Sequence, residues 1–155
     1  MDTAVPRFSS ARMALPVLAA ESDIPILGVV EPACAAAAAA TRNKKVGLIA
    51  TSASVRSGAY ERTLAAMDST ITVYAGACPL FVPLVEAGYV DHSEESRQQV
   101  TKLVIAQYLT EVREAGVDTL ILGCTHYPLL KTMIGEFMGR DVVLIDPAKT
   151  AAHRL

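Results

Sequence analysis

The side chains best suited to chemistry lie together in Gly123-Cys124-Thr125-His126-Tyr127-Pro128. A cysteine thiolate acts as a nucleophile or a general base, and a histidine two positions later exchanges protons near neutral pH. Pro128 suits the first turn of a helix, and the amino terminus of a helix stabilises a thiolate or a bound carboxylate. The segment therefore predicts a reactive site, against the alternative that Cys124 only fills the end of a strand.

The elements that must position this segment are short buried strands alternating with helices. Apolar runs rich in Val, Ile and Leu predict parallel strands covered on both faces, at Ile24–Val30, Lys45–Thr51, Ile71–Ala75, Thr119–Gly123 and Val142–Ile145. Helices are predicted at Ala33–Thr41, Gly58–Met67, Phe81–Ala87, Ser93–Ala115 and Leu129–Met138. This alternation predicts an α/β fold with a doubly wound parallel sheet. Cys124 then follows the carboxyl end of a strand, where ligands bind in such sheets.

Two local patterns refine the predicted helices. In Ser93–Ala115 the 3.6-residue period predicts a buried stripe formed by Val100, Leu103, Val104, Gln107, Tyr108 and Val112. Ser93 is expected to begin this helix and Gly116 to end it. Glu31-Pro32 is expected to interrupt the chain before the alanine-rich helix and to mark a crossover between two domains.

Composition excludes several classes of function. A chain of 155 residues fits one α/β domain, or one domain and part of another. A net charge of −2 gives no electrostatic reason to bind nucleic acid or an anionic membrane. The three cysteines lack metal-site or disulfide-framework spacing, and no apolar run approaches a membrane span. We therefore expect a cytoplasmic protein.

The reactive segment also resembles a known family. Gly-Cys-Thr-His-Tyr-Pro-Leu-Leu at 123–130 resembles the second catalytic cysteine motif of glutamate racemases, and residues 24–32, 46–60, 78–88 and 143–147 resemble other segments of that family in the same order. The resemblance implies that residues 43–147 form the second domain of a two-domain racemase. Residues 1–42 would be a remnant of the first domain with the crossover helix, and residues 148–155 the start of the return to it.

The resemblance implies interconversion of L- and D-glutamate without a cofactor or metal, supplying D-glutamate for peptidoglycan. Two cysteines would act on opposite faces of the α-carbon, and Cys124 would be one of them. Thr125, His126 and Thr51 would then contact glutamate, with His126 and Glu86 tuning proton transfer at Cys124. From the residues alone, a solvated acid at a helix end is the favoured interpretation of Glu86, and Thr51 either contacts a substrate or only caps the next helix.

Three other residues have structural interpretations. Cys34 lies among alanines and is expected in the core, and Cys78 is expected to pack in a crowded turn beside Pro79. Asp146 before Pro147 is expected to cap a helix.

The sequence departs from the family at the first catalytic cysteine. The family's Ala-Cys-Asn-Thr-Ala-Ser loop would fall near Arg7-Phe8-Ser9, where there is no cysteine. We therefore expect a truncated chain that lacks activity alone. Its first-domain remnant is expected to expose strand edges and apolar faces, which favours association with another copy or a complementary fragment.

Other functions stay open at this point. The chain is alternatively a non-catalytic module that binds a ligand or partner, or a racemase of a related amino acid such as aspartate, although the His126-Tyr127 pair favours glutamate. A Cys–His hydrolase would form a covalent acyl intermediate. A nucleotide-binding role lacks both glycine-rich phosphate-binding motifs.

Overall fold

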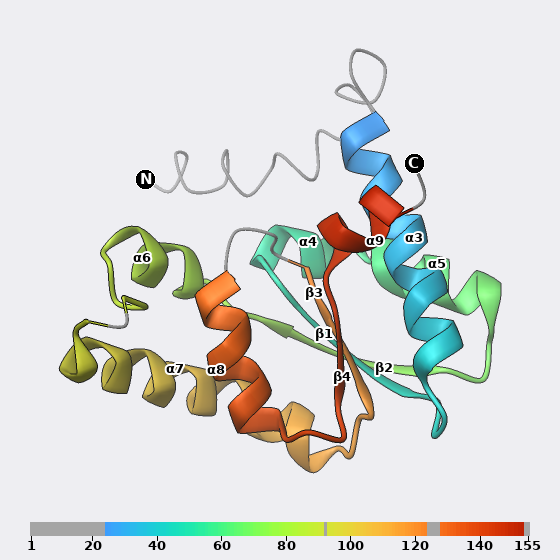
Figure 1. Ribbon diagram of the computed structural model, residues 1–155. Helices are drawn as coiled ribbons and strands as arrows, with labels where there is room; N and C mark the ends of the chain where they lie inside the picture. Colours follow the sequence, from blue (N-terminus) through green and yellow to red (C-terminus); the bar gives the residue numbers. More distant parts are fainter. Residues whose placement is uncertain (1–23, 92, 124–127, 154–155) are drawn as a thin grey trace.

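The computed structural model describes residues 24–91, 93–123 and 128–153 (Figure 1). Its strands are β1 (Lys45–Ala50), β2 (Thr72–Ala77), β3 (Thr119–Leu122) and β4 (Val143–Ile145). Its helices are α3 (Ile24–Ala40), α4 (Ser52–Ser57), α5 (Ala59–Met67), α6 (Phe81–Glu86), α7 (Glu95–Glu114), α8 (Pro128–Met138) and α9 (Pro147–His153). Within these three stretches, no helix is both long enough and apolar enough to span a membrane.

The four strands form one parallel sheet in the order β2-β1-β3-β4. The chain leaves β1 to build β2 on one side and then returns to place β3 on the other side. In the register, Ala50 pairs with Ala77 of β2, and Ile49 pairs with Leu122 of β3. This order puts the reversal of winding between β1 and β3, and it confirms the predicted parallel α/β architecture.

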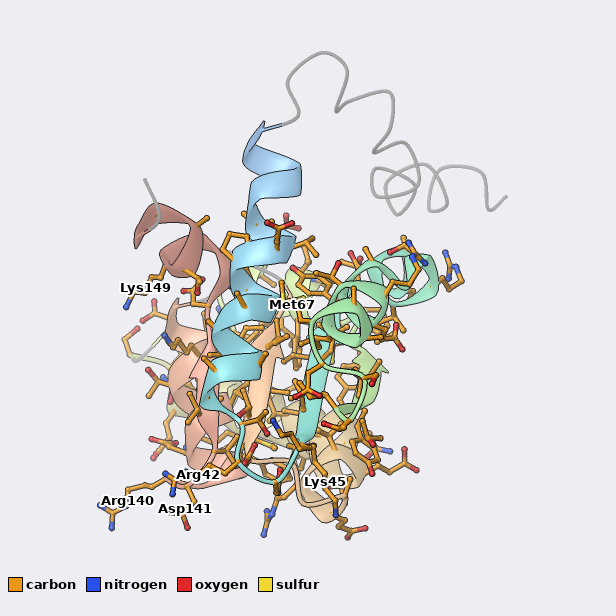
Figure 2. The ribbon with its side chains drawn as sticks, turned by 90° about the vertical axis from the view of Figure 1, so that its right-hand side faces the viewer. Arg42, Lys45, Met67, Arg140, Asp141 and Lys149 are labelled. Atoms are coloured by element: carbon orange, nitrogen blue, oxygen red, sulfur yellow. The ribbon has the colours of Figure 1, made fainter. Side chains whose placement is uncertain are left out.

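Helices cover both faces of the sheet, and alternate residues of β1 face opposite cores. Val46, Leu48 and Ala50 pack with α3 and α5 on one face. Ile49 belongs to the other core, which contains the buried residues of α7 and α8. Figure 2 shows α3 in front of the sheet, between α9 and α5. The chain is therefore doubly wound, as the near-continuous apolar strands predict.

The strand predicted at Ile24–Val30 is wrong, because these residues form the first turns of α3. Glu31-Pro32 does not interrupt the chain either, since Pro32 lies inside the same helix. A short apolar run does not distinguish a buried strand from a buried helix by its periodicity. The strong helix formers that follow, Ala35–Ala40, favour extension of the helix.

The buried stripe predicted on α7 is also wrong in part. The fully buried positions include Thr101, Ile105 and Leu109, whereas the side chain of Leu103 is 70% exposed. Thr101 tolerates complete burial because its hydroxyl donates a hydrogen bond to the carbonyl oxygen of Tyr89 at 2.8 Å. A hydrophobic period alone does not reveal a polar residue with a partner elsewhere in the chain.

The expected limits of α7 are correct at one end only. Ser93 does not begin the helix, because its amide and hydroxyl both bind the Asp91 carboxylate and regular helix starts at Glu95. Gly116 adopts a φ of +82° just beyond the helix end, in the left-handed region that glycine enters without strain.

Candidate active site

The candidate site lies at the edge of the sheet where the parallel strands end. Thr51 follows β1, Cys78 follows β2, and Gly123 follows β3. The Cys78 amide donates to the Ala50 carbonyl at 2.9 Å, and the Gly123 amide donates to the Ile49 carbonyl at 2.7 Å. The segment after β3 therefore starts at the reversal between β1 and β3, the position of ligand crevices in doubly wound sheets.

Gly123 is required there by a close backbone approach. A Cβ atom on this residue would lie 2.7 Å from the Cβ of Ala50 and 2.7 Å from the carbonyl oxygen of Ile49. The second contact is with backbone and cannot be relieved by rotating a side chain. Glycine thus allows the chain to leave β3 directly against the end of β1.

Cys124, Thr125 and His126, which the sequence predicts to form the reactive site, lie outside the described residues, and their roles stay predictions. The flanking elements agree with the predicted arrangement: β3 ends at Leu122, and α8 begins at Pro128. A strand, a short connection and a helix at the β1–β3 reversal are the elements that an anion-binding site needs.

Thr51 has a structural role at the same edge. Its Oγ1 accepts the Ser54 amide at 3.2 Å and donates to the Ser54 hydroxyl at 3.0 Å. Thr51 is thus the N-cap of α4, which confirms the capping interpretation. Its side chain stays partly exposed, so contact with a substrate is a prediction that the cap does not preclude.

Glu86 ends α6 and is exposed. Among the described residues no hydrogen bond or ion pair involves its carboxylate, and none links it to Thr51. Figure 1 shows α6 on the side of the sheet where the strands end. The structure therefore places Glu86 near the correct edge without assigning it a partner.

The two other cysteines are packed in the protein interior. Cys34 is fully buried on α3, with its thiol directed at the Tyr60 carbonyl 3.6 Å away. Burial, with a further contribution from the Glu31 carboxylate, raises the pKa of the Cys34 thiol to about 12. Cys78 is buried in the core that α7 and α8 cover. Both expectations of a packing role are confirmed.

Two other polar residues make structural hydrogen bonds in the elements that follow the strands. Asp146 caps α9, as predicted, by accepting the Ala148 amide at 3.0 Å. The hydroxyl of Tyr108 accepts the Leu80 amide at 3.1 Å, a contact that the sequence analysis missed. A tyrosine on a mostly buried helix face normally finds a hydrogen-bond partner, and this general rule was the available signal.

Comparison with known proteins relates this arrangement to the racemases. The chain is 45% identical over 145 residues to the glutamate racemase of Geobacter metallireducens, covering 94% of this chain and 52% of that protein. It is 45% identical over 133 residues to the glutamate racemase of Lactiplantibacillus plantarum, covering 86% and 46%. The chain thus spans about half the length of the curated relatives it matches.

Solved structures show the same fold. A glutamate racemase isoform from Bacillus anthracis superposes with a TM-score of 0.74 at 33% identity, covering 94% of this chain and 53% of that one. A glutamate racemase from Francisella tularensis, solved in complex with D-glutamate, gives a TM-score of 0.69 at 33% identity over 81% of this chain and 44% of that one. The sequence profile of the Asp/Glu/Hydantoin racemases matches residues 8–155. By this match and these relatives, the chain belongs to the Asp/Glu/hydantoin racemase family.

Proposed function

We propose that this chain carries the Cys124 half of a cofactor-independent glutamate racemase active site. The carrying observation is the close contact of Gly123 with Ile49 and Ala50, because it fixes the residue immediately before Cys124 at the β1–β3 reversal. Of the three cysteines in the chain, Cys34 and Cys78 are packed in the two cores, which leaves Cys124 as the candidate acid/base. The named relatives are glutamate racemases, which supports glutamate as the ligand.

In the proposed reaction the Cys124 thiolate removes the α-proton of glutamate, forming a thiol and leaving the electron pair on the α-carbon. The same thiol then returns a proton to that face, or a second acid protonates the opposite face and inverts the centre. Thr125, His126 and Thr51 bind the substrate, while His126 and Glu86 tune proton transfer at Cys124. The amino terminus of α8 favours both the thiolate and the substrate carboxylate.

We further propose that residues 43–147 form the second domain of the racemase fold. Residues 1–42 then supply a first-domain segment and the crossover helix, and residues 148–155 begin the return to the first domain. This assignment fits the four parallel strands of the sheet, which all lie within residues 43–147. The proposed role is cytoplasmic supply of D-glutamate for peptidoglycan.

The test is deuterium incorporation at the α-carbon of each glutamate enantiomer in D₂O, with the purified chain and its Cys124→Ser variant. One acid/base predicts exchange in one enantiomer only, with retention of configuration and loss in the variant. Exchange that survives Cys124→Ser would contradict the role of Cys124. Exchange of both enantiomers with interconversion would show two acid/bases and contradict a half-site.

A non-catalytic, ligand-binding role is the second candidate, because two of the three cysteines, Cys34 and Cys78, are packed in the two cores and a racemase needs two acid/bases. It predicts no exchange with either enantiomer. Chemical-shift changes on adding glutamate that are abolished by Thr51→Val would then identify a binding module. Tighter binding of aspartate than of glutamate would identify aspartate as the ligand.

A further inference from the structure

Helix α6, which ends at Glu86, is too short to hold its own position. It has six residues, and isolated helices of this length are unstable in water. No side chain of its own N-cap residue, Leu80, caps its first turn. The position of Glu86 must therefore be set by contacts from outside α6.

One such contact fixes the start of α6. The Leu80 amide donates to the hydroxyl of Tyr108, on α7, at 3.1 Å. The Tyr108 ring also meets the ring of buried Phe81 edge to face, with centroids 5.4 Å apart and planes at 77°. The α7 side chain thus supplies the cap that α6 lacks.

A second contact fixes the chain after Glu86. It turns at Gly88, and the Tyr89 carbonyl accepts the hydroxyl of Thr101 at 2.8 Å. Thr101 is completely buried, so this hydroxyl has no solvent to replace its partner. Thr101 and Tyr108 are seven residues apart on α7, which places them on one face about 10.5 Å apart along the axis.

We propose that Thr101 and Tyr108 are positioning residues for Glu86. Their two hydroxyls hold both ends of residues 80–89 against α7, so that the carboxylate between them keeps a fixed place at the ligand edge. This inference rests on the proposed role of Glu86 and extends it to residues that are assigned no contact with glutamate.

Amide hydrogen exchange resolved by NMR tests the anchoring without requiring turnover. Tyr108→Phe keeps the ring contact and removes the acceptor, so exchange of the Leu80 amide should accelerate about tenfold while the β1 amides stay unchanged. Thr101→Val should accelerate exchange in residues 84–89. Tyr74→Phe and Thr110→Val are matched controls, since the Tyr74 hydroxyl has no hydrogen-bond partner among the described residues and Thr110 donates only to Ala106 of its own helix. An unchanged Leu80 amide in Tyr108→Phe would overturn the anchoring.

A double-mutant cycle tests the link to Glu86. In the α-deuteration assay, Tyr108→Phe should slow exchange about tenfold in the unsubstituted chain and have no further effect in a Glu86→Gln background. A merely structural role would slow both backgrounds equally, and that result would overturn the positioning role. Absence of α-proton exchange in the unsubstituted chain would instead contradict the proposed function, and the amide measurement keeps the two failures distinct.

Discussion

Two carboxylates at opposite ends of the parallel sheet, those of Asp118 and Glu86, differ in their hydrogen bonding. At the amino end, Asp118 accepts hydrogen bonds from the Thr41 hydroxyl at 2.6 Å and from the amides of Arg42 and Asn43 at 2.7 and 2.9 Å. At the carboxyl end, the Glu86 carboxylate has no hydrogen bond or ion pair within the described stretches. The Asp118 carboxylate is thus satisfied internally, whereas the exposed Glu86 carboxylate has no such partners among the described residues.

The electrostatics of Asp118 reflect this closure. Burial acts to raise the pKa of Asp118, but the hydrogen bonds from Thr41, Asn43, Arg42 and Thr119 together outweigh it and lower the pKa to about 2. A carboxylate held in this way stabilises the fold and is unavailable for proton transfer at neutral pH. The comparison teaches that a carboxylate with several internal hydrogen-bond donors stabilises the fold, whereas Glu86, for which a role at the ligand site is proposed, has no such donor among the described residues.

The largest expected contrast is in thiol reactivity. With iodoacetamide at pH 8, Cys124 should be alkylated at least about 100-fold faster than Cys34, because burial suppresses the Cys34 thiolate. Peptide mass spectrometry of the native chain measures both rates. If Cys34 were alkylated as fast as Cys124 in the folded chain, the core around α3 would have to open to solvent. The two cysteines would then not differ in reactivity.

Gly123→Ala should lower the free energy of unfolding by about 3 kcal/mol, because the new methyl group meets a backbone oxygen that cannot move aside. Urea unfolding measures the change. Gly135→Ala is the matched control: its added Cβ meets only the Leu144 side chain, at an ordinary 3.4 Å, and alanine favours the helix. If the Gly123→Ala variant were as stable as the unsubstituted chain, the backbone at Gly123 would be able to move away from Ile49 and Ala50 without cost.

Asp118→Asn should lower the free energy of unfolding by about 2 kcal/mol at pH 7, since an amide cannot replace both carboxylate oxygens as acceptors. Asp141→Asn is the control, because Asp141 is exposed near Arg42 and Arg140 and has no hydrogen-bond partner among the described residues (Figure 2). If the two substitutions lowered the free energy of unfolding equally, the hydrogen bonds of Asp118 would not stabilise the amino end of the sheet.

The Asp118 effect should also depend on pH. Its pKa is about 2 in the folded chain and about 4 in the unfolded chain, so the unfolded chain binds this proton first on acidification. The stabilisation is complete above about pH 4 and is lost as the pH falls through about 2. Urea titrations from pH 6 to pH 2.5 should therefore show the gap between Asp118→Asn and the unsubstituted chain narrowing; a constant gap would refute this assignment.

The smallest effect is expected on the outer face of α7. Leu103→Ala should change the free energy of unfolding by less than about 0.5 kcal/mol, because the side chain is largely in solvent. Leu109→Ala, at a fully buried position of the same helix, should cost about 3 kcal/mol. If both substitutions lowered the free energy of unfolding by similar amounts, Leu103 would be buried, as the sequence predicts.

Much of the fold could be predicted because the strands are short apolar runs between helices. The four strands of the sheet lie within a few residues of their predicted positions, and the core cysteines were placed correctly. The first apolar run was assigned to a strand because periodicity carries no information on whether a partner strand lies beside it. α3 takes that segment into a helix instead.

The segment that contains the candidate catalytic cysteine could be predicted from the sequence, but the hydrogen bonds that hold the neighbouring helix α6 could not. The Gly123-to-Pro128 segment is local in sequence, and so is its position between a strand and a helix. The Tyr108–Leu80 and Thr101–Tyr89 hydrogen bonds join residues 28 and 12 positions apart and leave no periodic signal. Polar contacts between distant residues therefore need the structure.

The hydrogen bonds of Asp118 also have a consequence during synthesis. Their donors at Thr41, Arg42 and Asn43 precede the acceptor by 75 to 77 residues. At roughly 5–20 residues per second, the ribosome makes the turn before β1 about 4–15 seconds before Asp118 exists. During that time β1 also lacks its neighbour β3. Its residues 46–50, which are buried in the finished sheet, then have one unpaired edge. The nascent chain must pass through this interval with an unpaired strand edge, the form most prone to pair with another chain.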